Sequence, residues 1–184
     1  MNNVIYLRGD AQRARHHVND FFAKHGQGRP ISNNDVDGHL SVVTVNGELV
    51  GAAYAAAAMS IADTLMVGGH GLDGIRVARR VHALEALVIA PDHRGQHYGT
   101  HLLGSVAGHA HRDFGADNLV TRVDDESPMA LAWFVARGFT VLAPDEVLTL
   151  DGVPLPGADG HSDAYLRLGR TTSNFTKSMA RVRQ

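Results

Sequence analysis

Hydrophobic and polar positions along this chain repeat with two periods, which together predict an alternation of strands and helices. Runs that alternate every second residue or are rich in β-branched residues predict strands at 4–8, 41–45, 48–57, 80–90, 118–123, 139–143 and 163–169. Helical spacing of apolar residues predicts three longer helices, which run from residue 11 to Gly26, from 98 to 114 and from 128 to 137. Strands dominate with helices between them, so the expected fold class is α+β around a mixed sheet.

The pair Asn46-Gly47 is the clearest local signal in this pattern. It separates two β-rich runs, and Asn-Gly is the preferred pair for a two-residue type I′ hairpin turn. The segment 59–75 is less regular, because a short apolar run is followed there by Gly68, Gly69, Gly71 and Gly74. This segment predicts a short helix or a mobile loop.

Composition narrows the class of protein. The formal net charge is −2 at pH 7, which gives no general reason to expect a nucleic-acid or membrane-surface protein. The chain has no cysteine, which excludes disulfides, thiolate zinc sites and a cysteine nucleophile. The first residues lack the apolar core of a signal peptide, and the longest uncharged apolar stretch, 49–62, is shorter than the ~20 residues that span a bilayer. A cytoplasmic location is therefore expected.

The length of 184 residues predicts one domain, here assigned to residues 1–170, followed by a basic tail at 171–184. No acidic residue follows Asp163, whereas the basic residues after it are Arg167, Arg170, Lys177, Arg181 and Arg183. We expect a solvated, disordered tail. The alternative is a nucleic-acid-binding tail, which would show salt-dependent binding that is lost on truncation after Gly169.

Candidate chemistry is concentrated between residues 88 and 103, VIAPDHRGQHYGTHLL. A strand ends at Pro91, a polar turn with Arg94 and Gly95 follows, and helical spacing begins close to Gly99. A helix N-terminus offers free N–H groups and the positive end of its dipole, and glycines let a ligand approach the backbone closely. The pattern therefore predicts a diphosphate site, although the same glycines also suit an ordinary strand–helix corner.

Two longer stretches resemble a known family. The chain has no Gly-Lys-Ser/Thr and its spacing is not Gly-x-Gly-x-x-Gly, which argues against a P-loop and a dinucleotide fold. Instead, LEALVIAPDHRGQHYGTHLL (84–103) resembles the pyrophosphate-binding motif of the GNAT N-acetyltransferases, a strand and a proline followed by Arg/Gln-x-x-Gly-x-Gly/Ala at a helix start. Downstream, SPMALAWFVARGFTVL (127–142) resembles that family's Asn-x-x-Ala-x-x-Leu/Phe-Tyr-x-x-x-Gly-Phe segment. The order and separation of the two motifs also fit the family.

The resemblance implies a fold and a co-substrate. The fold would be a mixed, mostly antiparallel central sheet flanked by helices, with a splayed parallel pair of strands at 80–90 and 118–123. Acetyl-CoA would lie in the opening between these strands, and a backbone N–H near Ile89 would polarise its thioester carbonyl. No metal is implied. The residues that the resemblance assigns to coenzyme A are Leu87, Val88, Ile89, Arg94, Gly95, Gln96, His97, Tyr98, Gly99, Thr100, Ser127 and Phe134.

Three of these positions depart from the family pattern. His97 replaces the first motif glycine, which costs about 1 kcal/mol or more if the backbone there has a positive φ. If the helix has already begun, a histidine is tolerable there, and its ring could cover a phosphate or partly close the site. Phe134 replaces a tyrosine that often protonates the leaving thiolate, so we interpret it as core packing. Ser127 replaces an asparagine, and its hydroxyl is expected to cap the following helix, with contact to the cofactor through water as an alternative or additional role.

Glu85 is the candidate catalytic base. An acceptor ammonium must lose a proton before it can attack, and period-two alternation places Glu85 on the same face as Leu87 and Ile89. A glutamate at this point also resembles small-amine and aminoglycoside-type members of the family, where it faces the acceptor. A solvated strand carboxylate remains the alternative. Asp124 and Asp125 are second candidates for holding a cationic acceptor, and His82 is a further candidate base.

The twelve histidines raise the question of a metal site. His97 and His101 are four residues apart on the predicted helix, a spacing that suits zinc, and His93 is close by. No carboxylate or further histidine completes a recognisable set, and these residues fall where a pyrophosphate should bind. No metal is therefore expected.

The predicted activity is transfer of an acetyl group from acetyl-CoA to a primary amine of a small molecule or peptide by direct attack. The alternative is a degenerate acyl-CoA-binding regulatory module on the same fold, for which His97 and Phe134 are the reasons. The acceptor would bind in the variable segments 11–37 and 59–75. A homodimer is implied only by the resemblance, and no nucleic-acid or membrane partner is expected.

Overall fold

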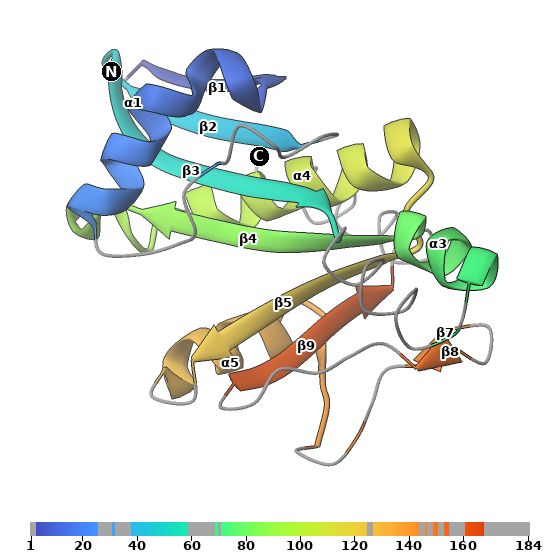
Figure 1. Ribbon diagram of the computed structural model, residues 1–184. Coiled ribbons are helices and arrows are strands. Elements are labelled where there is room, and N and C mark those ends of the chain that lie inside the picture. Colours follow the sequence, from blue (N-terminus) through green and yellow to red (C-terminus); the bar gives the residue numbers. More distant parts are fainter. Residues whose placement is uncertain are drawn as a thin grey trace.

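The structure of the protein is a computed structural model, which describes part of the 184-residue chain. It describes residues 3–25, 31, 38–58, 69, 71–124, 127–143, 146, 149–150, 153–154 and 161–167. In chain order, the elements shown in Figure 1 are β1 (Val4–Asp10), α1 (Ala11–Lys24), β2 (His39–Val45), β3 (Glu48–Ala57), α3 (Gly71–Arg79), β4 (Val81–Ile89), η1 (Pro91–His93), α4 (Tyr98–Phe114), β5 (Asn118–Asp124), α5 (Pro128–Val135), β6 (Thr140–Val141), β7 (Thr149–Leu150), β8 (Val153–Pro154) and β9 (His161–Arg167).

A seven-stranded sheet in the order β1-β2-β3-β4-β5-β9-β6 forms the centre of the fold. Every neighbouring pair is antiparallel except β4 and β5, which are parallel. Helices α1 and α4 cover the sheet on opposite sides (Figure 1). The predicted class, a mixed and mostly antiparallel sheet flanked by helices, is therefore confirmed.

Two hydrophobic clusters hold these helices against the sheet. On one face, Val18, Phe21 and Phe22 of α1 pack with residues of β2, β3 and β4. On the other face, α4 contributes Leu102, Leu103, Val106, Ala107 and Ala110, which are at most 1 % exposed. Burial of each leucine or valine side chain contributes about 1.5–3 kcal/mol to the free energy of unfolding. These contacts therefore fix the position of α4 on the sheet.

The β2–β3 hairpin turns at the predicted pair. Asn46 and Gly47 have φ values of 52° and 85°, the two positive φ angles that a type I′ turn requires. The strands pair from Val45↔Glu48 outward, with a register shift between Val43 and Thr44. The Asn-Gly signal thus predicts both the position and the geometry of this turn.

A β-bulge interrupts β4 at Glu85. Against β3, Ala86 pairs with Tyr54 and Leu84 pairs with Ala55, so Glu85 is the extra residue between the two pairs. The bulge changes which face the following residues occupy: Leu84 and Leu87 both pack on the α4 side, although they are an odd number of residues apart. Simple alternation through this strand, as expected from the sequence, therefore fails at Glu85.

The parallel strands β4 and β5 pair along only a short length. Their register is Val81↔Asn118, His82↔Leu119 and Ala83↔Val120, and no pair follows. At the point of separation, the buried Thr121 hydroxyl donates a hydrogen bond to the Leu84 carbonyl at 3.2 Å. A side chain thus completes the bonding where the backbone ladder ends, and the predicted splayed pair is present.

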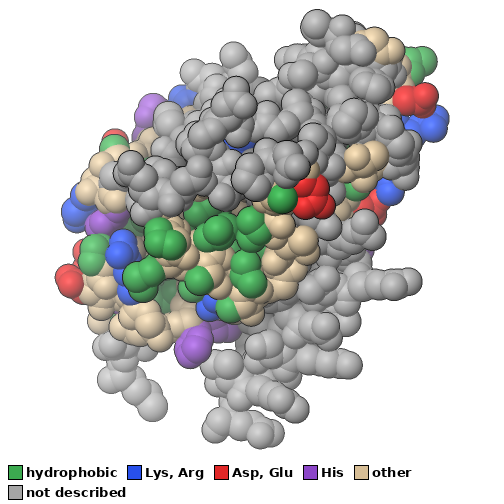
Figure 2. All heavy atoms as spheres, turned by 90° about the horizontal axis from the view of Figure 1, so that it is seen from below, with side chains coloured by type: hydrophobic (Ala, Val, Ile, Leu, Met, Phe, Trp, Pro, Cys, Tyr) green, Lys and Arg blue, Asp and Glu red, His purple; other side chains and the backbone are tan. Residues whose placement is uncertain are grey.

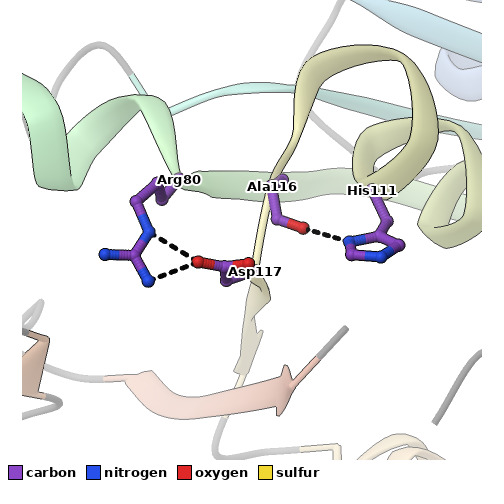
Figure 3. A network of polar contacts seen from close by, with 4 residues as sticks. All are labelled: Arg80, His111, Ala116 and Asp117. Atoms are coloured by element: carbon purple, nitrogen blue, oxygen red, sulfur yellow. Dashed lines mark hydrogen bonds and ion pairs between the residues drawn. The ribbon is translucent and has the colours of Figure 1, made fainter. Parts of the chain in front are cut away.

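Polar contacts fix the closed end of this splayed pair. Arg80, just before β4, forms an ion pair with Asp117, just before β5, and its carbonyl accepts from the Asp117 N–H at 2.9 Å. His111 Nδ1 lies 2.9 Å from the Ala116 carbonyl, which ties α4 to the same corner. Figure 3 shows these four residues converging from the starts of β4 and β5 and from α4. The two strands therefore begin side by side and separate toward their carboxyl ends.

Several predicted boundaries need correction. The glycine-rich segment at 59–75 leads into α3, of which Gly71–Arg79 is described, so the helix extends beyond the predicted segment. Helix α5 ends at Val135, because the Arg137 N–H turns back to the Phe134 carbonyl. The strand predicted at 139–143 is reduced to Thr140–Val141, and the small β7–β8 hairpin was not predicted.

Some expectations fall on other parts of the chain. The basic tail at 171–184, most of the segment 59–70 and much of 26–37 lie outside the described residues. In the part of the chain that the structure describes, no helix is long and apolar enough to cross a membrane.

Candidate functional site

The loop between β4 and α4 forms the base of the candidate site. Pro91 opens the short helix η1, and Gly95 and His97 then take φ values of 77° and 61°. Two left-handed residues within three positions turn the chain sharply, so that α4 begins at Tyr98. The first N–H groups of α4 have no intrahelical acceptor and lie directly beyond this turn.

His97 occupies the N-cap position of α4 with left-handed backbone geometry. The helix has therefore not begun at His97. Of the two alternatives that the sequence leaves open for this residue, the positive φ, which strains the backbone, is the one that applies. A non-glycine residue in this region costs about 1 kcal/mol or more. Its side chain forms no capping hydrogen bond, so the imidazole does not offset this cost at the helix end.

A cavity of about 520 Å³ opens beside the N-terminus of α4. Its walls come from the end of β4, the β4–α4 loop, the first turn of α4 and one face of α5. The lining residues are Leu87, Val88, Ile89, His93, Arg94, Gly95, His97, Tyr98, Gly99, Thr100, Met129, Ala130, Trp133, Phe134 and Arg137. Figure 2 shows apolar side chains gathered on the face that is seen from below Figure 1, with basic side chains beside them. Among the described residues, the lining contains two arginines and no carboxylate, so this cavity suits an anion with an apolar part.

Glycine is needed at position 99 because the Trp133 ring packs against it. A Cβ at Gly99 would come within 3.2 Å of the Trp133 Cζ2 atom, closer than most real Cβ contacts. Its φ is not positive, so this glycine is needed for close approach rather than for backbone freedom. The contact brings α5 up to the first turn of α4 and closes one side of the cavity.

Arg94 is one of the two cations that line the cavity. Its side chain is exposed, and its Nε donates a hydrogen bond of 3.2 Å to the Ile89 carbonyl at the end of β4. This bond covers a backbone acceptor on the wall of the cavity. Because the contact is exposed, exchange of Arg94 from this carbonyl to a bound anion costs little.

Arg137 is the second cation of the cavity, and several contacts fix its position. Its guanidinium carbon lies 3.6 Å from the centroid of the Trp133 ring, Nε donates to Thr100 Oγ1 at 3.0 Å, and Nη1 donates to the Trp133 carbonyl at 2.8 Å. Burial lowers the pKa of Arg137 from its usual value, because desolvation disfavours the charged form. The side chain nevertheless stays charged, since an arginine pKa begins so high.

Aromatic packing holds the α5 wall in place. The Phe134 ring lies 5.1 Å from that of Trp133 and 5.0 Å from that of Phe139, edge to face in both cases. Phe134 is 9 % exposed and belongs to the core beneath α4. The interpretation of Phe134 as core packing therefore agrees with its surroundings, although part of it also lines the cavity.

The structure brings most of the sequence-predicted coenzyme A residues together around this cavity. The residues at 87–89, 94–95 and 97–100 line it together with Phe134, whereas Gln96 and Ser127 do not. Ser127 is at the N-cap position of α5 but forms no capping hydrogen bond through its hydroxyl. The expected cap is therefore wrong: its backbone carbonyl, rather than its side chain, accepts from Ala130 and Leu131.

The candidate bases are more scattered. Glu85 is half-buried in the β4 bulge and lies near, but not on, the lining of the cavity. His82 is 1 % exposed at the far end of β4, with its ring 5.3 Å from that of Phe114, so it is not placed to act at this cavity. Asp124 ends β5, but its side chain and all of Asp125 lie outside what is described.

Three histidines lie in or next to the β4–α4 loop: His93, His97 and His101. His97 lies before the helix, so the helical spacing with His101 that could suit zinc does not apply. Among the residues that the structure describes, no group of three His, Asp or Glu side chains could hold a metal ion. His93 instead lines the cavity with a buried Nδ1 atom that forms no hydrogen bond to the described residues.

Sequence reasoning missed five lining residues, which are His93, Met129, Ala130, Trp133 and Arg137. A helical signal existed for most of them. Ala130 lies one turn before Phe134, and Met129, Trp133 and Arg137 follow one another at intervals of four. The sequence could therefore have predicted that these residues share one face of a helix. It could not have predicted that this face is turned toward α4.

Comparisons with known proteins agree with this geometry. The sequence pattern of the acetyltransferase (GNAT) family matches residues 7–139. Among curated proteins, no relative matches significantly.

Solved structures resemble the chain in fold at low identity. An acetyltransferase of the GNAT family from Staphylococcus aureus Mu50 is 12 % identical, with a TM-score of 0.61, and the match covers 91 % of this chain and 100 % of the other. The yncA protein of Salmonella typhimurium, solved with its cofactor acetyl-CoA, is 18 % identical with a TM-score of 0.61 over 91 % and 95 % of the two chains. The spermidine/spermine N-acetyltransferase SpeG of Vibrio cholerae, in mutant forms, is 12 % identical with a TM-score of 0.56 over 96 % and 98 %.

The family match spans more than half of the chain and includes both motifs that form the cavity. The fold, with its short parallel pairing of β4 and β5, is that of the solved acetyltransferases. The chain therefore belongs to the acetyltransferase (GNAT) family and is an acyltransferase.

Proposed function

We propose that this chain transfers an acetyl group from acetyl-CoA to a primary amine of a small molecule or peptide. The observation that carries the proposal is the cavity between the end of β4 and α5, which has an apolar wall, two arginines and the N-terminus of α4. These features match a donor with a long neutral arm and a diphosphate.

The residues present fit coenzyme A on physical grounds. The amides of the first α4 turn and Arg94 would hold the diphosphate, beside the wall that Trp133 forms by packing against Gly99. The neutral arm would follow Leu87–Ile89, where β4 has already separated from β5. The Ile89 carbonyl is now covered by Arg94, so donor binding would move Arg94 from this carbonyl to a phosphate.

The proposed reaction is a direct attack. The neutral amine nitrogen forms a bond to the thioester carbon, the carbon–sulfur bond breaks, and coenzyme A leaves as a thiolate with the bonding electron pair. The nitrogen then gives its second proton to the thiolate or to water, so that the products are a neutral amide and coenzyme A. No covalent enzyme intermediate is needed, which suits a chain without cysteine. A thiol pKa near 8.5 makes the thiolate a tolerable leaving group, so the missing hydroxyl at Phe134 does not prevent turnover.

Glu85 is proposed as the base that takes a proton from the acceptor ammonium, directly or through a water molecule. The bulge supports this role, because bulges re-aim a side chain beside active sites, and Glu85 lies two residues before the cavity wall at Leu87. The glutamate is half-buried, so it would remain accessible to an acceptor.

The role of Glu85 predicts a specific kinetic loss. Glu85→Gln keeps the shape and removes the base, so we expect kcat to fall by about 10²-fold or more while KM for acetyl-CoA stays unchanged. Glu48→Gln, an exposed glutamate at the start of β3, is the matched control and should retain wild-type rates. Full turnover of the Glu85→Gln variant across the pH range would remove Glu85 from the mechanism.

A panel of candidate amines tests which acceptor the protein acetylates. Because the Vibrio cholerae neighbour is a spermidine/spermine N-acetyltransferase, polyamines belong in the panel beside amino acids, aminoglycosides and peptide amines. Thiol release from acetyl-CoA, followed with a thiol reagent, reports turnover for every candidate. Release that depends on one amine class would identify the acceptor.

A second candidate function is an acyl-CoA-binding regulatory module without turnover. Strain at His97, which stands where the family has its first motif glycine, and the absence of a hydroxyl at Phe134 favour it. Acetyl-CoA binding without thiol release for any amine in the panel would support this candidate. Turnover with any acceptor would exclude it.

A further inference from the structure

Arg137 lines the cavity and has N–H groups that make no hydrogen bond to the described residues. Nε and one Nη1 proton are used by Thr100 and by the Trp133 carbonyl, which leaves a second Nη1 proton and both Nη2 protons. No carboxylate forms an ion pair with Arg137 in the described part of the chain. Within these described residues, the guanidinium therefore presents a positive charge at the cavity that no carboxylate neutralises.

The same contacts preorganise this cation. One face of the guanidinium is stacked on Trp133, which Gly99 allows to lie close to the first turn of α4. The Thr100 hydroxyl fixes the guanidinium from the α4 side. An arginine whose planar group is already held loses little further freedom on binding, and its remaining N–H groups suit the oxygens of a phosphate.

We propose that Arg137, held on Trp133, binds the 3′-phosphate of coenzyme A and makes the site select coenzyme A over 3′-dephospho-coenzyme A. This inference rests on the proposed function. The diphosphate is matched by the α4 amides and Arg94, so the 3′-phosphate is the remaining anion of the ligand. Arg137 is hydrogen-bonded to Thr100 in the first α4 turn, whereas Arg94 is hydrogen-bonded to the Ile89 carbonyl at the end of β4, so the two cations are held at different parts of the cavity wall.

Arg137 also has a structural role, because its bond to the Trp133 carbonyl satisfies a group near the end of α5. A purely structural role would change the affinity for every ligand of the cavity alike. A phosphate-binding role would change only the affinity for ligands that carry the 3′-phosphate. The ratio of the two dissociation constants therefore separates the roles.

The experiment is calorimetric titration of the full chain with coenzyme A and, separately, with 3′-dephospho-coenzyme A. The wild type should bind coenzyme A about 10-fold or more tightly, the value of a charge-assisted phosphate contact. Arg137→Met should weaken coenzyme A binding to the level of the dephospho ligand and leave the latter nearly unchanged. Arg94→Met is the matched control, and it should weaken both ligands by the same factor.

Two results would overturn the inference while leaving the proposed function intact. One is equal affinity of the wild type for the two ligands, and the other is a parallel loss of both affinities in Arg137→Met. Arg137→Lys provides a second variant if the methionine variant does not fold, and it should retain part of the preference. Failure of the wild type to bind either ligand at millimolar concentration would overturn the proposed function, and the inference with it.

Discussion

At the scale of single residues, His97 is the position where backbone strain and the candidate site meet. Its φ of 61° lies in the left-handed region, which glycine adopts without cost. The imidazole is exposed and forms no capping bond, so nothing in α4 compensates for the strain. Strain of this kind persists where the surrounding turn determines the backbone, here between Gly95 and the buried Tyr98.

His97→Gly should therefore raise the free energy of unfolding by about 1 kcal/mol, because glycine adopts the left-handed region freely. His97→Ala, which removes the imidazole but keeps a Cβ, should give no gain. Urea unfolding followed by circular dichroism measures both variants. A glycine variant that is no more stable than the alanine variant would show that the backbone at His97 is not strained.

At the scale of elements, the bulge in β4 shows where sequence patterns reach their limit. The Asn46-Gly47 turn was predictable because both positive φ values are properties of the two residues themselves. The bulge at Glu85 was not, because it depends on how Tyr54 and Ala55 of β3 pair with β4. A pattern within one strand carries no information on the register of its neighbour.

The candidate site also has residues that could be predicted from the sequence and residues that could not. Apart from Gln96, which does not line the cavity, the residues from Arg94 to Thr100 could be placed at the site from the sequence, since they are contiguous and their glycines are distinctive. The contact of Arg137 with Thr100 joins residues 37 positions apart, and the sequence carries no sign of it. Ser127 was a sound prediction for a capping position, but its hydroxyl does not make the bond.

Thr121 provides a test of how the two parallel strands separate. Its buried hydroxyl serves the Leu84 carbonyl where the ladder ends, so Thr121→Val, of the same shape, leaves that carbonyl unsatisfied. We expect the free energy of unfolding to fall by about 1–3 kcal/mol. Thr140→Val, at an exposed position of β6, is the matched control and should change stability little. Equal stability of the two variants in urea would show that the Thr121 bond is dispensable.

At the scale of the whole molecule, the sheet consists of two parts that meet along the β4–β5 pair. One part contains β1 to β4 and the other contains β5, β9 and β6, and only three residue pairs join them in the ladder. The Arg80–Asp117 ion pair supports the closed end, and the cavity residues of β4 lie toward the open end. A ligand in the opening would therefore contact both parts.

A ligand that binds only the folded state should stabilise the whole molecule. At acetyl-CoA concentrations 100 times the Kd, the gain is about 2.7 kcal/mol, which corresponds to a rise in Tm of roughly 5–10 °C for a chain of this size. Differential scanning fluorimetry measures the shift, with adenosine as a control that lacks both the diphosphate and the neutral arm. An unchanged Tm at millimolar acetyl-CoA would contradict binding in this opening.

The brevity of the β4–β5 ladder has a consequence inside a living cell. If the acyl donor occupies the opening, it acts as a removable part of the sheet, and a protein without it samples open forms more often. Proteases cut such open forms, so the lifetime of the protein would follow the supply of donor. Starvation for acyl-CoA would then lower the amount of enzyme as well as the rate of each molecule, without any dedicated regulator.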